Sequence, residues 1–305
     1  MFTLRALTQQ LTLALAISGL LCTSLQAAST TTPPVRVLAS LPITYGLSEL
    51  LLKDSGVNLE RAAAANLPGS RQSAYFSGRG APALHKMAQN ADAVVGLRSL
   101  WNDDPLYPMA RRSNIRIVEI DAARPVDGSL PGIAVQPGTS RDGLNSQPWL
   151  ASNNMGRMAD VIAADLIRLA PAAKPQIEAN LASLKQRLLK LSANSEAKLA
   201  EVNNLSVVSL SDRLDYLIAG LNLERMTVEH PAEQTWTPET LKALTQTLKN
   251  NDIALVLDHR QPSAELQAAV AEGASTLLVV SAEGDDPVTE LQHTVDAIVA
   301  GLPKG

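Results

Sequence analysis

One histidine in this sequence directly follows a predicted β-strand and could take part in ligand binding. His259 comes after the apolar run 253–258, and α/β proteins bind ligands at the carboxyl ends of their parallel strands. Together with Asp258 it would supply one imidazole and one carboxylate, which is half of a typical zinc or manganese site. Asp258 could equally form an ion pair with Arg260, so His259 and Asp258 are candidates for half a metal site at most.

The other three histidines lie in less suggestive places. His85 and His293 fall inside predicted helices, and His230 follows a predicted strand in a loop. We expect these three to be ordinary surface or hydrogen-bonded side chains.

Basic and aromatic side chains recur after several predicted strands. Arg71 and Tyr75 lie in a loop expected over residues 68–75, and Arg98 and Trp101, Arg213 and Tyr216, and His259 and Arg260 follow predicted strands. A guanidinium group presents a planar set of donors that suits carboxylates and phosphates. In a chain with a formal net charge of −4, this recurrence predicts a small anionic ligand, such as a metal chelate. The alternatives are a residual metal-ion site, or no small ligand, with several arginines paired with Asp92, Asp212 or Asp215.

Motifs typical of enzymes are missing from the sequence. There is no glycine-rich phosphate loop and no nucleophile elbow, and the glycines at positions 78 and 80 do not join a strand to a helix. The adjacent carboxylates Asp103–Asp104 and Asp285–Asp286 fall in predicted turns, where solvated charge is expected. We therefore expect a protein that is not an enzyme.

Residues 1–28 have the order of a secretory signal peptide. Arg5 precedes the apolar run 11–21, and Ala27 and Ala28 supply small residues for cleavage. The apolar run is too short to span a bilayer. We expect cleavage near Ala27 and Ala28 and a periplasmic protein; a buried N-terminal helix is the alternative.

The composition of the remaining chain limits its partners. Removal of Arg5 would leave 25 Lys and Arg against 30 Asp and Glu, and removal of Cys22 would leave no cysteine for a disulfide or a thiolate metal site. Leu20 and Leu21 precede Cys22 where lipid attachment requires a small residue. This mild acidity argues against nucleic acid, or an anionic membrane, as the main partner.

Strands and helices alternate along the chain, which predicts parallel sheets with crossover helices. The predicted strands cover residues 35–40, 91–97, 115–120, 205–210, 226–229, 253–258 and 275–280. The predicted helices cover residues 42–53, 81–89, 153–169, 175–202, 238–249, 263–272 and 286–300. Residues 126–147 lack periodicity and predict a surface loop.

The helix predicted over residues 175–202 carries a long apolar stripe that only Ser195 interrupts. At 1.5 Å per residue this helix would be about 42 Å long, which is enough to run between two lobes. The expected fold is therefore α/β, with one lobe over 29–171, a linking helix over 172–203 and a second lobe over 204–305. The cleft between the lobes is the expected ligand site; a coiled-coil dimer seam is the alternative.

Several short stretches, taken in order from Val35 to Leu302, resemble the metal-type solute-binding proteins of ABC importers. This group includes zinc- and manganese-binding periplasmic proteins and streptococcal adhesin-like lipoproteins. The stretches are Gln147–Leu150, Asn180 on the long helix, Val207–Asp212 with Tyr216, Trp236–Pro238 and Gln261–Ser263. The resemblance implies two lobes joined by a rigid helix, one metal ion in the cleft and delivery to a membrane permease. We expect a monomer.

The four places where this family has metal ligands carry other residues here. Ser73 and Gln147 each stand where the resemblance implies a histidine, Ser211 where it implies histidine or glutamate, and Ser281 where it implies aspartate. Three hydroxyls and one amide supply no charge, so a bare divalent ion would lose its hydration shell for little return. The resemblance implies zinc or manganese. The neutral side chains at these four positions argue against a bare metal ion, and this favours an anionic ligand or a docking protein that binds no small ligand.

Overall fold

The computed structural model describes residues 33–135, 147–228, 235–281 and 284–303. The expected signal peptide and half of the loop predicted over 126–147 lie outside these ranges. The chain from Pro34 onward forms one compact unit. No helix in the described part of the chain is long and apolar enough to cross a membrane.

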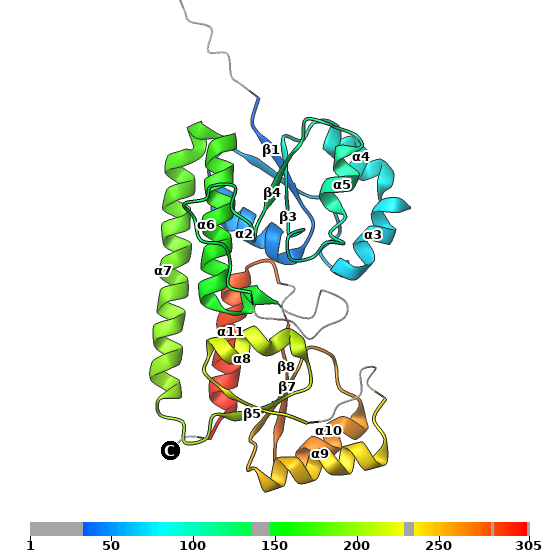
Figure 1. Ribbon diagram of the computed structural model, residues 1–305, viewed down its shortest axis with the longest axis vertical. Coiled ribbons are helices and arrows are strands. Elements are labelled where there is room, and N and C mark those ends of the chain that lie inside the picture. Colours follow the sequence, from blue (N-terminus) through cyan, green and yellow to red (C-terminus); the bar gives the residue numbers. More distant parts are fainter. Residues whose placement is uncertain (1–32, 136–146, 229–234, 282–283, 304–305) are drawn as a thin grey trace, which may run out of the picture. The chain divides into compact units, whose positions relative to one another are not determined.

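Two four-stranded sheets, parallel throughout, form the framework of this unit (Figure 1). The first has the order β2 (Asn58–Arg61), β1 (Arg36–Ala39), β3 (Ala93–Gly96), β4 (Val118–Asp121). The second has the order β6 (Glu224–Met226), β5 (Ser206–Ser209), β7 (Leu255–Asp258), β8 (Thr276–Val279). The central strands are almost wholly buried, as expected for parallel sheets covered on both faces.

Helices connect the strands in both halves of the chain. In the first half they are α2 (Pro42–Leu52), α3 (Gly69–Ser77), α4 (Ala81–Gln89), α5 (Leu106–Arg111) and α6 (Ser152–Leu169). The long helix α7 (Lys174–Leu199) follows, and then α8 (Asp215–Gly220), α9 (Pro238–Asn250), α10 (Ala264–Glu272) and α11 (Pro287–Gly301). Short 3-10 helices lie at Pro148–Leu150 (η1), Pro171–Ala173 (η2) and Asp212–Leu214 (η3).

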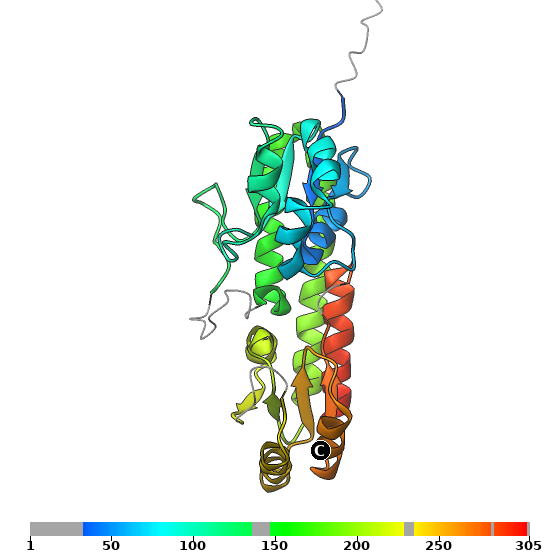
Figure 2. The same ribbon diagram turned by 90° about the vertical axis from the view of Figure 1, so that its right-hand side faces the viewer.

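Helix α7 is 26 residues long and contacts α6, α2 and α11 (Figures 1 and 2). Its buried face consists of Ile177, Leu184, Leu188, Leu191, Ser195 and Leu199. The hydroxyl of Ser195 donates to the carbonyl of Ser192 at 2.8 Å, so this polar residue is satisfied within the helix. Because α7 packs on helices from both halves of the chain, the predicted α/β fold with one long connecting helix is confirmed.

Helix α11 is held against both α7 and α2. Asp286 caps it by accepting hydrogen bonds from the backbone N–H groups of Val288 and Thr289, both at 3.0 Å. Arg187 on α7 donates to the same carboxylate at 2.8 Å. Gly46 on α2 lies so close that a Cβ atom there would be 2.6 Å from the carbonyl oxygen of Asp285. One apolar core therefore continues from the first sheet through α7 to α11.

The structure corrects the predicted elements in the first half. Residues 68–75, expected as a loop, largely form α3, which was missed because it buries only Gln72 and Phe76 and has no apolar stripe. The strand predicted over 115–120 is formed by Val118–Asp121 instead, because residues 112–117 form a turn. Strand β2 and helix α5 were also missed.

Two smaller differences occur in the second half. The strand predicted over 226–229 is formed by Glu224–Met226. The short helix α8 was missed, although it follows the stretch around Ser211 that the resemblance emphasised.

Candidate ligand site

Ser211 follows β5 and already has a structural role. It is 4% exposed, and its Oγ accepts a hydrogen bond from the backbone N–H of Arg213 at 3.3 Å, which caps η3. Ser209 Oγ donates to the carbonyl of Ser211 at 2.9 Å. The residue at this position is therefore a buried neutral hydroxyl engaged in holding the turn after the strand.

The carboxylate of Asp258, at the end of β7, is buried among donors. Its Oδ1 accepts from the backbone N–H of His259 at 2.7 Å and from the Nε of Arg260 at 3.4 Å. Burial by itself raises the pKa of Asp258, but the His259 side chain, the charge of Arg260 and two backbone N–H groups together hold that pKa below its ordinary value. Asp258 is thus kept ionised, and its carboxylate is engaged by His259 and Arg260.

The side chains beside Asp258 tie two strand ends together. Arg260 donates to the carbonyl of Leu210 at 3.2 Å, which joins the end of β7 to the end of β5. The Nδ1 atom of His259 lies 3.3 Å from Oδ1 of Asp258. The ion pair between Asp258 and Arg260 that the sequence suggested is present.

Gln147 lies directly before η1 and is half-buried. Its backbone carbonyl accepts from the N–H of Leu150 at 3.0 Å. The indole Nε1 of Trp149, two residues on, is buried without a hydrogen-bond partner in the described structure. The side chains here can offer hydrogen bonds to a ligand but no charge.

Three predicted site residues, Arg71, Ser73 and Tyr75, lie on α3 rather than in a loop. Gln72 takes the inward position, is 0% exposed, and donates through Nε2 to the carbonyl of Ser40 after β1 at 3.0 Å. Arg71 and Ser73 are therefore turned outward and exposed, and Tyr75 is half-buried. No sequence pattern marked Gln72, whose buried Oε1 lacks a hydrogen-bond partner in the described structure.

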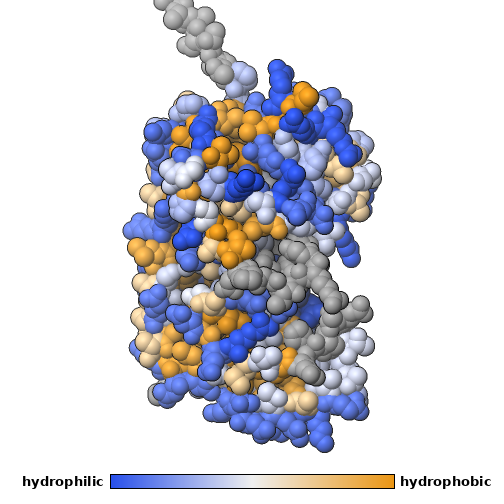
Figure 3. Space-filling view, viewed as in Figure 1, coloured by the Kyte–Doolittle hydropathy of each residue, from blue (hydrophilic) through white to orange (hydrophobic). Residues whose placement is uncertain are grey.

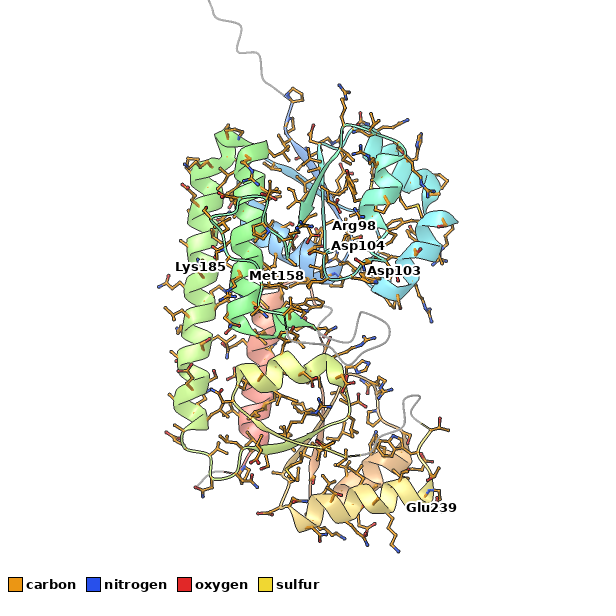
Figure 4. The ribbon with its side chains drawn as sticks, viewed as in Figure 1. Arg98, Asp103, Asp104, Met158, Lys185 and Glu239 are labelled. Atoms are coloured by element: carbon orange, nitrogen blue, oxygen red, sulfur yellow. The ribbon has the colours of Figure 1, made fainter. Side chains whose placement is uncertain are left out.

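Arg98 and Trp101 follow β3, and the side chain of each is already engaged by other parts of the protein. Arg98 donates to both carboxylate oxygens of Glu119 at 3.0 Å (Figure 4 labels Arg98). Trp101 is 7% exposed and its ring packs close to Gly69, so it serves the core. An open hollow beside Arg98 is lined by both charges, from Arg98 and Arg124 and from Glu119 and Asp121.

Asp104 is not the solvated loop charge that the sequence suggested. Its side chain is buried and accepts from the backbone N–H groups of Leu97 at 2.8 Å and Leu106 at 3.1 Å. Burial raises the pKa of Asp104, and the two backbone donors oppose that shift. Asp104 thus fastens the end of β3 to the start of α5 (Figure 4).

The acidic neighbours of Arg213 pair with a different residue. Asp212 and Asp215 both form ion pairs with Arg225, and Asp92 accepts from the backbone N–H of Arg36. Neither Arg213 nor Arg71 forms an ion pair with any residue that the structure describes. Within that part of the chain, no carboxylate neutralises these two guanidinium groups, so both could interact with an anionic ligand.

Ser281 is exposed after β8, and Asp285, four residues further on, contacts the first sheet. Asp285 accepts from Arg61, at the end of β2, at 2.7 Å. The guanidinium of Arg61 also lies over the ring of Tyr45, 3.9 Å from its centroid. Sequence reasoning missed Arg61, because nothing local marks a partner so distant along the chain.

The remaining histidines bring no further metal donors together. His85 Nδ1 lies 2.7 Å from the hydroxyl of Ser113, and His293 is exposed on α11. His230 lies outside the described residues. Within the described ranges, no three His, Cys, Asp or Glu side chains are grouped so that they could hold a metal ion. The hydroxyl and amide side chains of Ser73, Gln147, Ser211 and Ser281 carry no charge.

Comparison with known proteins gives the same architecture. The family described as zinc-uptake complex component A, periplasmic (ZnuA), matches residues 79–301. A mutant of FpvC from Pseudomonas aeruginosa has a similar structure, with a TM-score of 0.68 and 20% identity over 88% of this chain and 98% of that one. Zn(II)-bound AdcA from Streptococcus pneumoniae has a TM-score of 0.67 and 18% identity, over 89% of this chain and 59% of that one. The metal-dependent lipoprotein YcdH from Bacillus subtilis has a TM-score of 0.66 and 15% identity, over 88% and 99%.

Proposed function

This chain belongs to the ZnuA family of metal-type solute-binding proteins of ABC importers, which are not enzymes, and from that premise we propose that its ligand is not a bare divalent metal ion. The chemistry of the four expected ligand positions carries this proposal. Ser73, Gln147, Ser211 and Ser281 are all neutral, and zinc or manganese sites in proteins are built from imidazole, carboxylate or thiolate.

The local structure supports the same conclusion. The hydroxyl of Ser211 is occupied as a helix cap, and Asp258 is occupied by backbone donors and Arg260. A metal ion at either place would have to displace hydrogen bonds that already satisfy buried groups, and an unsatisfied buried group costs about 1–3 kcal/mol.

A small anionic ligand, such as a metal chelate, is the candidate that the cations favour. Arg71 and Arg213 carry guanidinium groups without ion pairs among the described residues, and the buried indole N–H of Trp149 lacks an acceptor there. An anionic chelate would use those charges and hydrogen bonds, and it would bring its own metal ligands.

Native mass spectrometry with elemental analysis of the protein isolated from the periplasm tests this proposal. We expect no stoichiometric zinc or manganese bound directly by the protein. An adduct whose mass is that of an organic anion, with or without metal, would support the anionic ligand. A bare metal ion at one per chain that survives dialysis would contradict the proposal, and a protein that copurifies with nothing would favour a docking role.

We also propose that residues 1–28 are removed on export and that the mature protein works in the periplasm beside a membrane permease. The segment has the charged, apolar and small-residue order of a signal peptide. N-terminal sequencing of the periplasmic form should begin near Ala28, and an intact Met1 would contradict this.

A further inference from the structure

One surface of the first half collects positive charge around an exposed aliphatic side chain. It consists of Lys86 on α4, Arg111 at the end of α5, and Arg112, Ile115 and Arg116 in the turn that leads to β4; we call it the basic turn surface. All five residues are exposed, and Ile115 is 76% exposed. Figure 3 shows that the face over α4 and α5 is mainly hydrophilic.

Hydrogen bonds hold this turn in a fixed position against α4. The side-chain amide of Asn114 donates to the carbonyls of Ala88 at 3.1 Å and Ala91 at 2.8 Å. The hydroxyl of Ser113 lies 2.7 Å from Nδ1 of His85 on the same helix. The flanking arginines and Ile115 are thus presented from a preorganised turn, which lowers the entropy lost on binding.

The positive charges of the basic turn surface form no ion pairs within the described structure, although Asp92 lies beside the turn, where its backbone carbonyl accepts from Val118 and its carboxylate from the backbone N–H of Arg36. Residues 79–91 and 105–117 contain no aspartate or glutamate. None of Lys86, Arg111, Arg112 and Arg116 forms an ion pair within the described structure; Arg111 donates instead to the hydroxyl of Tyr107 at 2.6 Å. By contrast, Arg225, Lys249 and Arg260 in the second half all pair with acidic residues.

The basic turn surface lies at the amino ends of the strands of the first sheet, since its turn precedes β4. The predicted ligand residues follow the carboxyl ends of strands instead. A partner on this surface therefore need not compete with the ligand. Val118, on the edge strand β4, is a second exposed apolar side chain, at 47%.

We propose that the basic turn surface docks on a membrane that contains anionic phospholipid. Arginine and lysine bind lipid phosphates, and an aliphatic side chain that protrudes between them can enter the boundary between headgroups and acyl chains. An acidic protein surface would use the arginines but would leave Ile115 against polar groups. The net acidity of the whole chain, which argued against such a partner, is screened beyond a distance of about 10 Å at 0.1 M salt. The docking does not depend on the identity of the ligand.

Cosedimentation of the exported protein with vesicles tests the proposal. One vesicle set is phosphatidylcholine alone and the other contains about one third phosphatidylglycerol, at low and high salt. We expect binding to the anionic vesicles only, reduced by high salt. We expect Arg112→Ser with Arg116→Ser to weaken binding at least tenfold, and Ile115→Ser to weaken it at both salt concentrations.

Lys190→Ser with Lys242→Ser is the matched control, because both lysines are exposed, without ion pairs among the described residues, and far along the chain from the turn. This control removes the same charge and should bind as the unmodified protein does. Equal loss in both double variants would show that only net charge matters and would overturn the proposal. Failure of the unmodified protein to bind anionic vesicles, or equal competition by soluble polyglutamate or inorganic phosphate, would also overturn it.

Discussion

The guanidinium group of Arg61 lies 2.7 Å from the carboxylate of Asp285, so the end of strand β2 is joined to the segment before helix α11. The side chain of Arg61 is only 15% exposed, and it is stacked over Tyr45, whereas that of Asp285 is 68% exposed. The two partners should therefore contribute unequally to stability, because one side chain is packed and the other is solvated.

Arg61→Ala should lower the free energy of unfolding by about 1–2 kcal/mol, since it removes the stacking on Tyr45 as well as the ion pair. Asp285→Asn should cost about 0.5 kcal/mol or less, because an exposed carboxylate gains little from a screened pair. Urea denaturation gives both values. The exposed pair of Arg36 and Glu60 is the control, and Arg36→Ala should resemble Asp285→Asn. An equal loss for Arg61→Ala and Asp285→Asn would contradict this account.

Two leucines on α7 offer a direct test of how that helix packs. Leu184 is 2% exposed and faces the core shared with α2, α6 and α11, whereas Leu189 is 71% exposed. Leu184→Ala should cost about 2–5 kcal/mol and Leu184→Pro at least about 3 kcal/mol, while Leu189→Ala should stay within about 0.5 kcal/mol. Thermal or urea unfolding measures all three, and similar values for the two alanine variants would mean that the buried face has been assigned wrongly.

Helix α7 shows why part of this fold could be predicted from sequence. From Leu184 onward its buried residues recur every three or four positions, and the partly buried Leu181 lies between Ile177 and Leu184, which is the pattern of a packed helix. Helix α3 has no such pattern, because its outer face is open and only Gln72 and Phe76 are buried. Helix α7, which buries a full stripe, was therefore predicted, whereas α3, which buries two side chains, was not.

The candidate site could be predicted only where it follows a buried strand. Asp258, His259 and Arg260 come directly after β7, so their position at a strand end was visible. The pair of Arg61 and Asp285 joins residues 224 positions apart, and no local pattern encodes a contact of that kind. The buried carboxylate of Asp104 was misread because the two N–H groups that it binds belong to the backbone, which any sequence supplies.

Asp104 should give the protein a pH dependence of opposite sign to that of most carboxylates. Burial raises its pKa in the folded state, so folding favours the protonated form. Its contribution to stability is present below the pKa of the unfolded chain and is lost as pH rises through the higher folded value. Asparagine does not titrate, so the Asp104→Asn variant lacks this loss of stability. The free energy of unfolding of the unmodified protein should therefore approach that of the variant as pH rises from about 4 to 7. Melting temperatures over that range measure the difference.

The asparagine variant should still be less stable overall, because its amide can accept only one of the two backbone hydrogen bonds. Asp258→Asn provides the contrast. Its folded pKa is lowered, so its contribution is lost as pH falls through that lower value, and its stability difference should instead grow with rising pH. A difference for Asp104→Asn that also grows with pH would show that the carboxylate is not destabilised by burial.

Whether the protein binds a bare metal ion can be tested by placing histidines at positions 147 and 211, which carry neutral residues. Calorimetric titration of the unmodified mature protein with zinc should show no submicromolar stoichiometric site at neutral pH. Gln147→His combined with Ser211→His should raise zinc affinity at least about tenfold, because each good donor added to a zinc site is worth more than a hydrogen bond to a neutral group. Gln147→Asn with Ser211→Asn is the control, since asparagine can replace the serine as the cap of η3 but supplies no imidazole. If the asparagine pair gains as much zinc affinity as the histidine pair, the metal binds elsewhere. If the unmodified protein itself binds zinc tightly, His259 and Asp258 are the residues to substitute first.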